Sequence, residues 1–407
     1  MRILKWLYPG MGVKRWIGLA GLGILIVVGA IVNQITEYKY FNNSFINIAT
    51  LLFGCFLIII SGRKAFVSIV TVFVPHKDNL VDIVYQKRHL ERGPRIVVIG
   101  GGTGLSTMLH GLKQYTSNIT AIVTVADDGG SSGRLRKEFD VLPPGDIRNC
   151  LVALADRESL MQDLFQFRFE SDSALSGHSF GNLFLTAMTK VTGDFEKAIK
   201  ESSQVLAIRG QVIPSTLEKI TLVAEYYDGS FLEGESNFRF KDSPIKRVSL
   251  KPSNPVAPPE TLRAIMEAEA IVLGPGSLYT SIIPNLLVKN ISQAIIESKA
   301  LKIYVCNAMT QAGETANYKA SDHIRAIIEH SHPKIIGYCI LNTKLISKEL
   351  LDKYSKDNSF PVEADINKIK SLGYKFISDD IISTKDFIRH DTKKLARIII
   401  SLIEEKA

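Results

Sequence analysis

The stretch that decides the fold is Ile96-Val-Val-Ile-Gly-Gly-Gly-Thr-Gly104. Four branched apolar residues end in a cluster of glycines, and apolar residues at helical spacing follow at Leu105, Met108, Leu109 and Leu112. This order predicts a buried strand, a tight glycine turn and a helix whose inner face packs on a sheet. Such a turn presents backbone N–H groups at the positive end of a helix dipole, which favours phosphate. A phosphate-bearing ligand, above all a nucleotide, is the first expectation.

The glycine turn alone does not identify the ligand. Counting from Gly102, the third glycine of a dinucleotide fingerprint is replaced by Thr107, and no Lys-Ser/Thr pair follows as it would in a Walker A loop. A tight strand-to-helix turn that binds nothing is the alternative.

Later apolar runs repeat the pattern. Residues 120–126 follow the first helix at the spacing of a βαβ unit, which requires parallel pairing. Further strands are expected at 270–273, 302–305 and 334–341, with helices at 260–269, 288–298, 320–330 and 392–404. The alternation predicts a Rossmann-like, doubly wound α/β fold with a mainly parallel sheet.

The middle of the chain has a different pattern. Helices are expected at 147–155, 159–167, 182–191 and 194–208, and residues 221–233 predict a hairpin that turns at Asp228-Gly229. A Pro-rich stretch, 252–259, returns the chain to the sheet. We therefore expect a helical and antiparallel insertion at about 150–258 within an α/β domain of residues 95–407.

Two apolar, nearly uncharged stretches precede this domain, at about 16–35 and 45–61. Each is about long enough to cross a bilayer core of roughly 30 Å, the second only just. A cleaved signal peptide is the alternative for the first stretch, but a second span follows closely and no small-residue cleavage site is clear. Residues 1–62 are therefore predicted to form a transmembrane hairpin in the cell membrane.

The charges that flank the two spans predict the orientation of the hairpin. Basic residues precede the first span and follow the second, at Arg2, Lys5, Lys14, Arg15, Arg63 and Lys64. Both ends are then expected in the cytoplasm, together with the main domain. Residues 65–74 are apolar but too short to span, so they are expected in the interface or packed on the hairpin, within a juxtamembrane connector of residues 63–94.

Composition excludes some functions. The chain has 407 residues and a net charge of +8, part of which is the basic cluster beside the spans. It has no basic stripe interleaved with aromatics, so no nucleic-acid partner is expected. The cysteines, Cys55, Cys150, Cys306 and Cys339, lack C-x-x-C spacing, and the eight histidines show no metal-ligand spacing. No G-x-S-x-G elbow supports nucleophilic catalysis.

A second motif, Ala126-Asp-Asp-Gly-Gly-Ser-Ser-Gly-Arg134, follows the second predicted strand, at the edge where doubly wound sheets bind ligands. Asp127 and Asp128 could accept hydrogen bonds from a ribose or hold Mg²⁺ against phosphates. They are the candidates for catalysis and for a metal. A solvated Asx turn is the alternative.

Two further motifs enter predicted helices. Asp146 is expected to be an N-cap, with Arg148 and Asn149 in the first turn, where the helix dipole disfavours a cation and so indicates an anionic partner. His178, in Gly177-His-Ser-Phe-Gly-Asn182, could act as an acid or base or bind phosphate. A lone histidine is also often structural.

A third group of small polar residues follows two later strands. The run 274–281 repeats the strand, glycine turn and helix, and Asn307 and Thr310 follow the next strand. The candidate ligand-binding residues are therefore Gly100, Gly101, Gly102, Thr103, Gly104, Asp127, Asp128, Gly129, Gly130, Ser131, Ser132, Arg134, Asp146, Arg148, Asn149, His178, Asn182, Gly274, Pro275, Gly276, Ser277, Asn307 and Thr310.

These blocks in this order resemble the bacterial gluconeogenesis factors (YvcK-like proteins), distant relatives of the 2-phospho-L-lactate transferases (CofD-like). The resemblance covers residues 95 to the C-terminus, and the hairpin lies outside the common core. It implies a Rossmann-like fold with an inserted subdomain, and a nucleotide-linked ligand that is a UDP-sugar such as UDP-N-acetylglucosamine, or NAD(P). It also implies a role in cell shape and wall synthesis on gluconeogenic carbon sources. Cell-wall regulatory proteins and a second copy of the chain are the expected partners.

Two functional hypotheses follow. In the first, the chain is a membrane-anchored regulator in which the turns at 101–104 and 274–277 hold phosphates, Asp127 and Asp128 hold hydroxyls, and Arg134 and Arg148 balance charge. In the second, it is a Mg²⁺-dependent transferase acting on a nucleotide diphosphate carrier, as the CofD-like resemblance implies, with metal on the two aspartates. A scaffold with a vestigial nucleotide site is a third reading.

Overall fold

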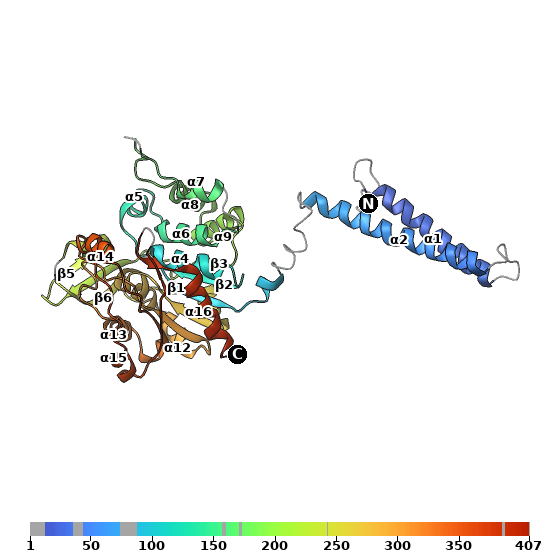
Figure 1. Cartoon of the computed structure of the whole chain (residues 1–407). Helices are drawn as coiled ribbons and strands as arrows, with labels where there is room; N and C mark the ends of the chain where they lie inside the picture. The colour runs from blue at the N-terminus through green and yellow to red at the C-terminus, as the bar shows by residue number, and fades with distance from the viewer. Residues whose placement is uncertain are drawn as a thin grey trace. The chain divides into compact units, whose positions relative to one another are not determined.

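The computed structural model of the chain describes residues 13–35, 44–73, 88–156, 160–170, 173–241, 243–384 and 387–406, with side chains up to residue 68 in the second range. The chain divides into two compact units, Met1–Arg88 and His89–Ala407 (Figure 1).

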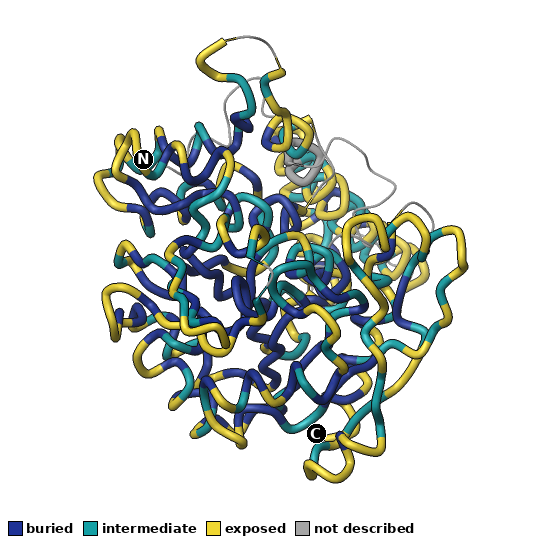
Figure 2. Tube along the Cα trace, turned by 90° about the vertical axis from the view of Figure 1, so that its left-hand side faces the viewer, coloured by how far each residue is buried: buried dark blue, intermediate teal, exposed yellow. Residues whose placement is uncertain are grey.

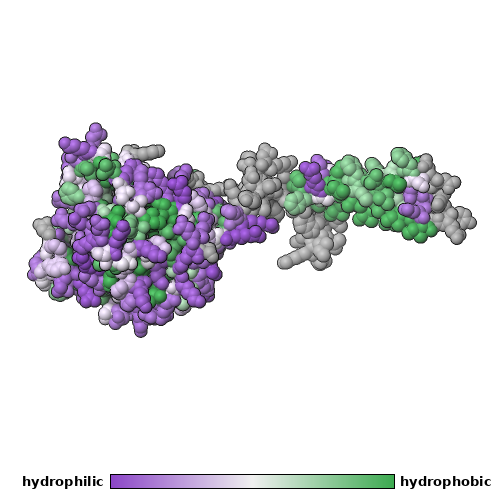
Figure 3. Space-filling view, turned by 60° about the horizontal axis from the view of Figure 1, so that its bottom comes forward, coloured by the Kyte–Doolittle hydropathy of each residue, from purple (hydrophilic) through white to green (hydrophobic). Residues whose placement is uncertain are grey.

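The N-terminal unit is a helical hairpin of α1 (Lys14–Ile35) and α2 (Ser44–Phe73). Glycines let the two backbones approach, since a Cβ atom at Gly23 would lie 2.9 Å from the carbonyl oxygen of Gly54. Asn33 Nδ2 donates a hydrogen bond to Asn47 Oδ1 at 3.4 Å. The described surface of the pair is mostly apolar, with hydrophilic patches on it (Figure 3). The basic residues Lys14, Arg15, Arg63 and Lys64 are exposed.

Both helices are long and apolar enough to cross a bilayer, over Lys14–Ile35 and Ser44–Ser68. The expected break after residue 62 is absent, because α2 continues to Phe73. Residues 65–73 therefore extend the second helix and do not form a separate interfacial segment. No proline or glycine occurs between Gly62 and Pro75, and lysine and arginine are good helix formers. Residues 74–87 of the expected connector lie outside the described residues.

The C-terminal unit is built on a seven-stranded sheet in the order β10-β9-β8-β7-β1-β2-β3. Every strand pair in it is parallel. The strands are β1 (Ile96–Gly100), β2 (Ile119–Val123), β3 (Gln211–Pro214), β7 (Ala270–Leu273), β8 (Leu301–Val305), β9 (Tyr338–Asn342) and β10 (Lys375–Asp379). The predicted parallel α/β fold is therefore confirmed.

The core lies along the central strands (Figure 2). All residues of β1, β2 and β7 are buried, which explains their unbroken apolar runs. The helices and short turns of the unit are α4 (Gly102–Leu112), α5 (Gly130–Phe139), α6 (Gly145–Leu154), α7 (Leu160–Gln166), α8 (Phe180–Thr192), α9 (Phe195–Val205), η3 (Glu235–Phe240), α10 (Pro259–Glu267), η4 (Leu278–Ile282), α11 (Ile283–Leu286), α12 (Ile291–Glu297), α13 (Ala320–His330), η5 (Pro333–Ile335), α14 (Lys348–Ser355), α15 (Ile366–Ser371) and α16 (Thr392–Glu404). Helix α4 packs on α6 and on α16, and α10 packs on α12.

The insertion differs in part from the expectation. Its antiparallel sheet is present as β5 (Phe231–Glu233), β4 (Thr221–Tyr226) and β6 (Ile245–Lys251), with the predicted hairpin between β4 and β5. Strand β3, however, belongs to the main sheet although its residues were expected in the insertion. It was missed because it is only four residues long and ends in proline, which is typical of an edge strand. A separate two-stranded ribbon pairs β11 (Ile382–Ser383) with β12 (Arg389–His390).

The order of the main sheet reverses between β1 and β7. From β1 the chain adds β2 and β3 on one side, and from β7 it adds β8, β9 and β10 on the other. Ligands of open α/β sheets bind at such a switch point, outside the carboxyl ends of the strands. The turns that follow β1 and β7 are therefore where a site is expected.

Candidate functional site

The two glycine turns meet at the switch point. A Cβ atom at Gly104 would lie 2.6 Å from the carbonyl oxygen of Pro275, and one at Gly276 would lie 3.3 Å from the carbonyl oxygen of Gly101. Gly102 has a φ of +64°, a conformation that side chains other than glycine rarely adopt. Glycine is needed here both for backbone conformation and for close approach of the two turns.

A cavity of about 250 Å³ opens between these two turns and the segment that follows β8. Of the predicted site residues, it is lined by Gly101, Gly102, Thr103, Gly104, Pro275, Gly276, Ser277, Asn307 and Thr310. Residues from three later segments complete the wall: Gln311, Ser359, Arg389 and His390 among them.

The cavity wall contains two helix beginnings without capping side chains. Helix α4 starts at Gly102, and its N-cap residue, the extended Gly101, has no side chain that could cap it. The helical turn η4 starts after Ser277, whose Oγ accepts from Gln311 Nε2 at 2.7 Å and makes no capping hydrogen bond to the turn. The first N–H groups of a helix have no partner inside the helix and are drawn to anions. Thr107, the residue in place of the third glycine, donates to the carbonyl of Thr103 at 2.8 Å and so bonds within its own helix.

Asp146 is not the N-cap that the sequence predicted. Helix α6 begins at Gly145 with Pro144 as its N-cap, which places Asp146 inside the first turn. Its carboxylate points at the glycine turn, since a Cβ atom at Gly101 would lie 2.5 Å from Asp146 Oδ2. Burial is the largest cause that raises the pKa of Asp146, to about 7, and the negative charge of Asp127 adds to the rise. A hydrogen bond from the Gly102 backbone opposes it.

Further carboxylates face the same region. Burial raises the pKa of Glu235 well above its usual value, and the charges of Asp127, Asp146, Glu314 and Asp128 add to the effect. Glu235 lies in η3 of the insertion, and the η3 backbone N–H of Ser236 donates to Asp128 Oδ1 at 3.0 Å. The acidic motif after β2 therefore ties the insertion to the α/β core.

Glu314 is a buried acid at the β7 turn that the sequence patterns do not predict. Burial raises its pKa to about 7, although hydrogen bonds from the Tyr279 and Thr280 backbones and the Thr280 side chain oppose the rise. Its Oε2 atom is buried and has no hydrogen-bond partner among the described residues. No motif surrounds Glu314 in the sequence, so only the fold brings it to the β7 turn.

The geometry for a metal is limited. No three His, Cys, Asp or Glu residues in the described ranges are arranged to hold a metal ion. Asp127 Oδ1 accepts from the Gly129 backbone at 2.9 Å, as in a local Asx turn. Magnesium is commonly held by one or two carboxylates together with substrate phosphates, so Asp127 and Asp128 fit the ion only with a diphosphate present.

A second group of predicted residues forms a buried polar network away from the cavity wall. Ser131 Oγ lies 2.9 Å from His178 Nδ1 and accepts from Asn182 Nδ2 at 3.0 Å. Burial lowers the pKa of His178, so the ring is neutral near pH 7. The network joins α5 to α8, and Ser132 Oγ accepts from the Gly145 backbone at 3.1 Å. These residues position the helices that carry the carboxylates.

The two predicted arginines belong to this second group. Arg134 donates to the carbonyl of Ser176 at 2.6 Å, and Arg148 donates to Ser179 Oγ and, at 2.6 Å, to Asn149 Oδ1. Neither lines the cavity between the glycine turns. The cation that does line it is Arg389 of β12, which makes no ion pair with any described residue and stacks on the Phe387 ring at 5.3 Å. Next to it, burial lowers the pKa of His390 to about 4.

Comparisons with known proteins agree with this geometry. The family model of 2-phospho-L-lactate transferase CofD matches residues 96–382, which include both glycine turns and the acidic motif. The gluconeogenesis factor of Bacillus subtilis is 50% identical over 77% of this chain and 99% of its own length. The chain belongs to the gluconeogenesis factor family.

Other members of the family differ in length. A relative from Clostridium acetobutylicum is 46% identical over 100% of this chain and 93% of its own length. A crystal structure of a UPF0052 family member from Bacillus halodurans superposes with a TM-score of 0.73, at 50% identity, over 75% of this chain and 99% of that one. The α/β unit is thus the part common to these relatives, and the N-terminal segment occurs in only some of them.

Proposed function

We propose that the chain is a regulator that binds a nucleotide-linked ligand, a UDP-sugar such as UDP-N-acetylglucosamine or NAD(P), at the switch point of its sheet. The observation that carries the proposal is the contact of the two glycine turns around a cavity of about 250 Å³. Both turns offer uncapped helix starts to a diphosphate. One exposed cation, Arg389, is available at the same wall.

The carboxylates suit the uncharged part of such a ligand. Carboxylate oxygens accept hydrogen bonds from ribose and sugar hydroxyl groups, whereas they repel phosphates. We place the diphosphate on the turns at 101–104 and 274–277, and the hydroxyl groups toward Asp127, Asp128 and Glu314. The raised pKa of Asp146 eases the approach of the diphosphate, since a protonated carboxyl does not repel it.

The N-terminal hairpin would anchor this regulator to the membrane. The spans α1 and α2 are apolar. Lys14 and Arg15 begin α1, and Arg63 and Lys64 lie in the C-terminal half of α2, after the apolar run 45–61. Positive charges favour the cytoplasmic side of a membrane, so in this proposal the α/β unit lies in the cytoplasm. In this position the regulator would act on cell shape and wall synthesis during gluconeogenic growth, through cell-wall regulatory proteins and as a homo-oligomer.

The alternative function is a Mg²⁺-dependent transferase that acts on a nucleotide diphosphate carrier. The match to the CofD family model favours it, and so does the pair Asp127 and Asp128 at the end of β2. The two carboxylates would hold the ion, which neutralises charge on the phosphates. Turnover that requires Mg²⁺ and is lost in Asp128→Asn would support the transferase, and ligand binding undiminished in EDTA would count against it.

A ligand panel tests the proposal. Melting and calorimetry of the full chain in detergent would use UDP-N-acetylglucosamine, NADP⁺ and GDP, each with and without Mg²⁺. We expect the UDP-sugar or NADP⁺ to raise the melting temperature, and Gly102→Val to abolish the effect, because valine does not adopt the φ of +64° that this position has. Stabilisation by GDP alone would contradict the assignment of the ligand.

A further inference from the structure

Helices α5, α6 and α8 begin close to one another. Their starts are joined in pairs by three hydrogen bonds: Asn182 Nδ2 donates to Ser131 Oγ at 3.0 Å, the Gly145 backbone donates to Ser132 Oγ at 3.1 Å, and Arg148 Nη1 donates to Ser179 Oγ. The N–H groups at the start of a helix carry partial positive charge. The first turns of α5 and α8 contain no acidic residue, and Asp146 of α6 is directed at Gly101. The point where the three helices meet therefore favours an anion.

Three arginines converge on the short loop that precedes α8. Arg134 Nη2 donates to the carbonyl of Ser176 at 2.6 Å, and Arg168 Nη1 donates to the next carbonyl, that of Gly177, at 2.5 Å. Arg148 reaches the end of the same loop through the hydrogen bond described above. None of the three arginines forms an ion pair with a residue that the structure describes. Their positive charges are therefore left for an anionic ligand.

A neutral histidine lies in the middle of this loop. Ser131 Oγ accepts from Asn182 and so directs its own proton to His178 Nδ1, which is 2.9 Å away. Burial lowers the pKa of His178, so the ring is neutral near pH 7 and its proton is on Nε2. This nitrogen has no hydrogen-bond partner among the described residues, and it adds a donor next to the arginines.

Two buried polar atoms at the same place lack a partner within the described ranges. They are Nε of Arg148 and Oδ1 of Asn182, a residue that is only 2% exposed. Both residues are hydrogen-bonded to Ser179 Oγ, the second through its backbone N–H at 3.3 Å, so they are neighbours. Buried donors and acceptors are nearly always paired in native proteins. A ligand that accepts from Arg148 and donates to Asn182 would satisfy both.

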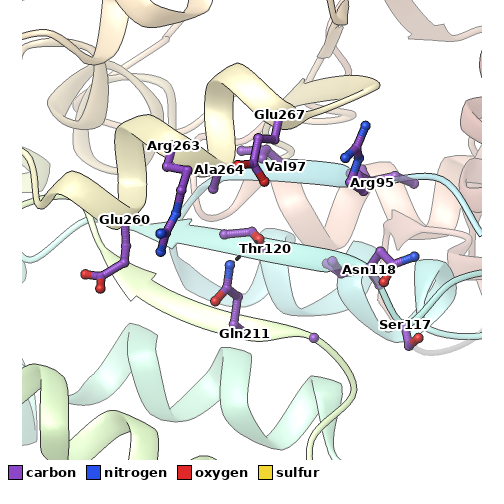
Figure 4. A pocket seen from close by; sticks show the side chains of 13 residues that line it. Arg95, Val97, Ser117, Asn118, Thr120, Gln211, Glu260, Arg263, Ala264 and Glu267 are labelled. Carbon is purple, nitrogen blue, oxygen red and sulfur yellow. Dashed lines mark hydrogen bonds between the residues drawn. The ribbon is translucent and has the colours of Figure 1, made fainter. Parts of the chain in front are cut away.

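The cavity at the opposite edge of the sheet has a different charge pattern. It has a volume of about 310 Å³ and lies at the amino ends of β1, β2 and β3 (Figure 4). Its lining mixes Arg263 of α10 with Glu260 and Glu267, and its Arg95 pairs with Glu269 at 3.4 Å. This cavity has no excess of positive charge, so Arg263 provides a matched control for the three arginines.

We propose that the starts of α5, α6 and α8 form a site for a phosphoryl group that carries an O–H donor, which is inorganic phosphate or a small hydroxylated phosphate monoester. Arg134, Arg148 and Arg168 bind the phosphoryl oxygens, and Asn182 Oδ1 accepts from the O–H group. None of these residues lines the cavity between the glycine turns. The phosphoryl group is therefore a second ligand, and its binding does not depend on the proposed function.

The test is calorimetry of the full chain in detergent, in a buffer without phosphate. The probes are inorganic phosphate, glycerol 3-phosphate and sulfate. We expect at least one of the first two to bind with a Kd below about 1 mM. Sulfate should bind at least tenfold more weakly, because it has no proton near pH 7 to donate to Asn182. Tighter binding of glycerol 3-phosphate than of phosphate would identify a monoester as the ligand, and the reverse order would identify the free anion.

Arginine variants locate the binding. Arg134→Gln and Arg168→Gln should each weaken it at least tenfold, and both side chains are exposed, so folding should be unaffected. Arg263→Gln should bind like the wild type. No binding of either phosphorylated probe, unchanged affinity in Arg134→Gln and Arg168→Gln, equal loss in Arg263→Gln, or equal binding of sulfate would each overturn the proposal.

One further variant separates this site from the nucleotide site. Arg389→Gln should keep its affinity for the phosphorylated probe while it loses affinity for a nucleotide diphosphate. Loss of both in Arg389→Gln would place the probe at the glycine turns and overturn the proposal. Retained phosphate binding in a chain that binds no nucleotide would contradict the proposed function alone.

Discussion

The carbonyl oxygen of Pro275 lies 2.6 Å from the position that a Cβ atom would take at Gly104. The turn after β1 is thereby in direct contact with the turn after β7, across the point where the strand order reverses. The two turns are separated by about 170 residues of chain. Because they are in contact, they form one continuous wall of the cavity at the switch point.

Gly104→Ala should push the two turns apart. The added methyl group cannot be accommodated against the Pro275 carbonyl without a shift of the backbone. We therefore expect the free energy of unfolding to fall by about 1–3 kcal/mol and ligand binding to weaken. Urea denaturation measures the first effect. Gly100→Ala is the control, because a Cβ atom there meets only ordinary contacts, the nearest at 3.7 Å. Equal loss of stability in both variants would show that the Pro275 contact is not the cause.

Asp146→Asn should change the dependence of stability on pH. The raised pKa of Asp146, about 7 against a usual 3.8, means that the folded protein holds a proton that the unfolded chain releases. This group therefore lowers stability as pH rises from about 4 to 7. The free energy of unfolding of the asparagine variant should decline less over this range. Between pH 4 and pH 8 the variant should gain on the order of 1 kcal/mol of stability relative to wild type. Asp163→Asn, an exposed acid of α7, is the control and should follow the wild-type curve.

Ligand affinity should fall as pH rises from 6 to 8. A bound diphosphate next to Asp146 favours the protonated form of this carboxyl group, whose pKa is about 7, so binding takes up protons. Calorimetry at pH 6, 7 and 8 measures this dependence. It should be smaller in Asp146→Asn, and an affinity that rises with pH would contradict the placement of the diphosphate next to Asp146.

Arg389→Gln should weaken binding of a nucleotide diphosphate about tenfold, since charge-assisted hydrogen bonds contribute about 1.5–3 kcal/mol. The Arg389 side chain is exposed and has no ion-pair partner among the described residues, so folding should be unaffected. Arg397→Gln removes an exposed arginine of α16 that does not line the cavity, and it should leave affinity unchanged. Equal affinities in all three proteins would exclude Arg389 from the site.

The hairpin should place the chain in the membrane fraction. We expect carbonate washing not to release the full chain, because α1 and α2 are long and apolar enough to span. Removal of residues 1–73 deletes both candidate spans and should therefore move the α/β unit to the soluble fraction. Full-length chain found wholly in the soluble fraction would contradict the membrane anchor.

Sequence patterns predict the parallel sheet and its glycine turns because both have local causes. Apolar runs, glycines and helical spacing occur within about fifteen residues at the turn after β1. Asp146 was placed wrongly because two prolines precede it. Pro144 takes the N-cap and leaves the aspartate inside the helix.

Other features depend on the tertiary fold. Glu235, Glu314 and Arg389 lie in segments without a recognisable motif, and only the chain's path brings them near the carboxyl ends of β1, β2 and β7. Strand β10 (Lys375–Asp379) is half-exposed at the edge, so its sequence has no continuous apolar run.

Hydrogen–deuterium exchange of the full chain tests the central claim most directly. With saturating UDP-N-acetylglucosamine or NADP⁺, backbone amides in 101–107 and 275–281 should exchange more slowly, because they donate to the diphosphate. The account predicts this protection in both turns together, and its loss in Gly104→Ala. Protection confined to other segments, or no change in either turn at ligand saturation, would contradict a nucleotide-linked ligand at the switch point.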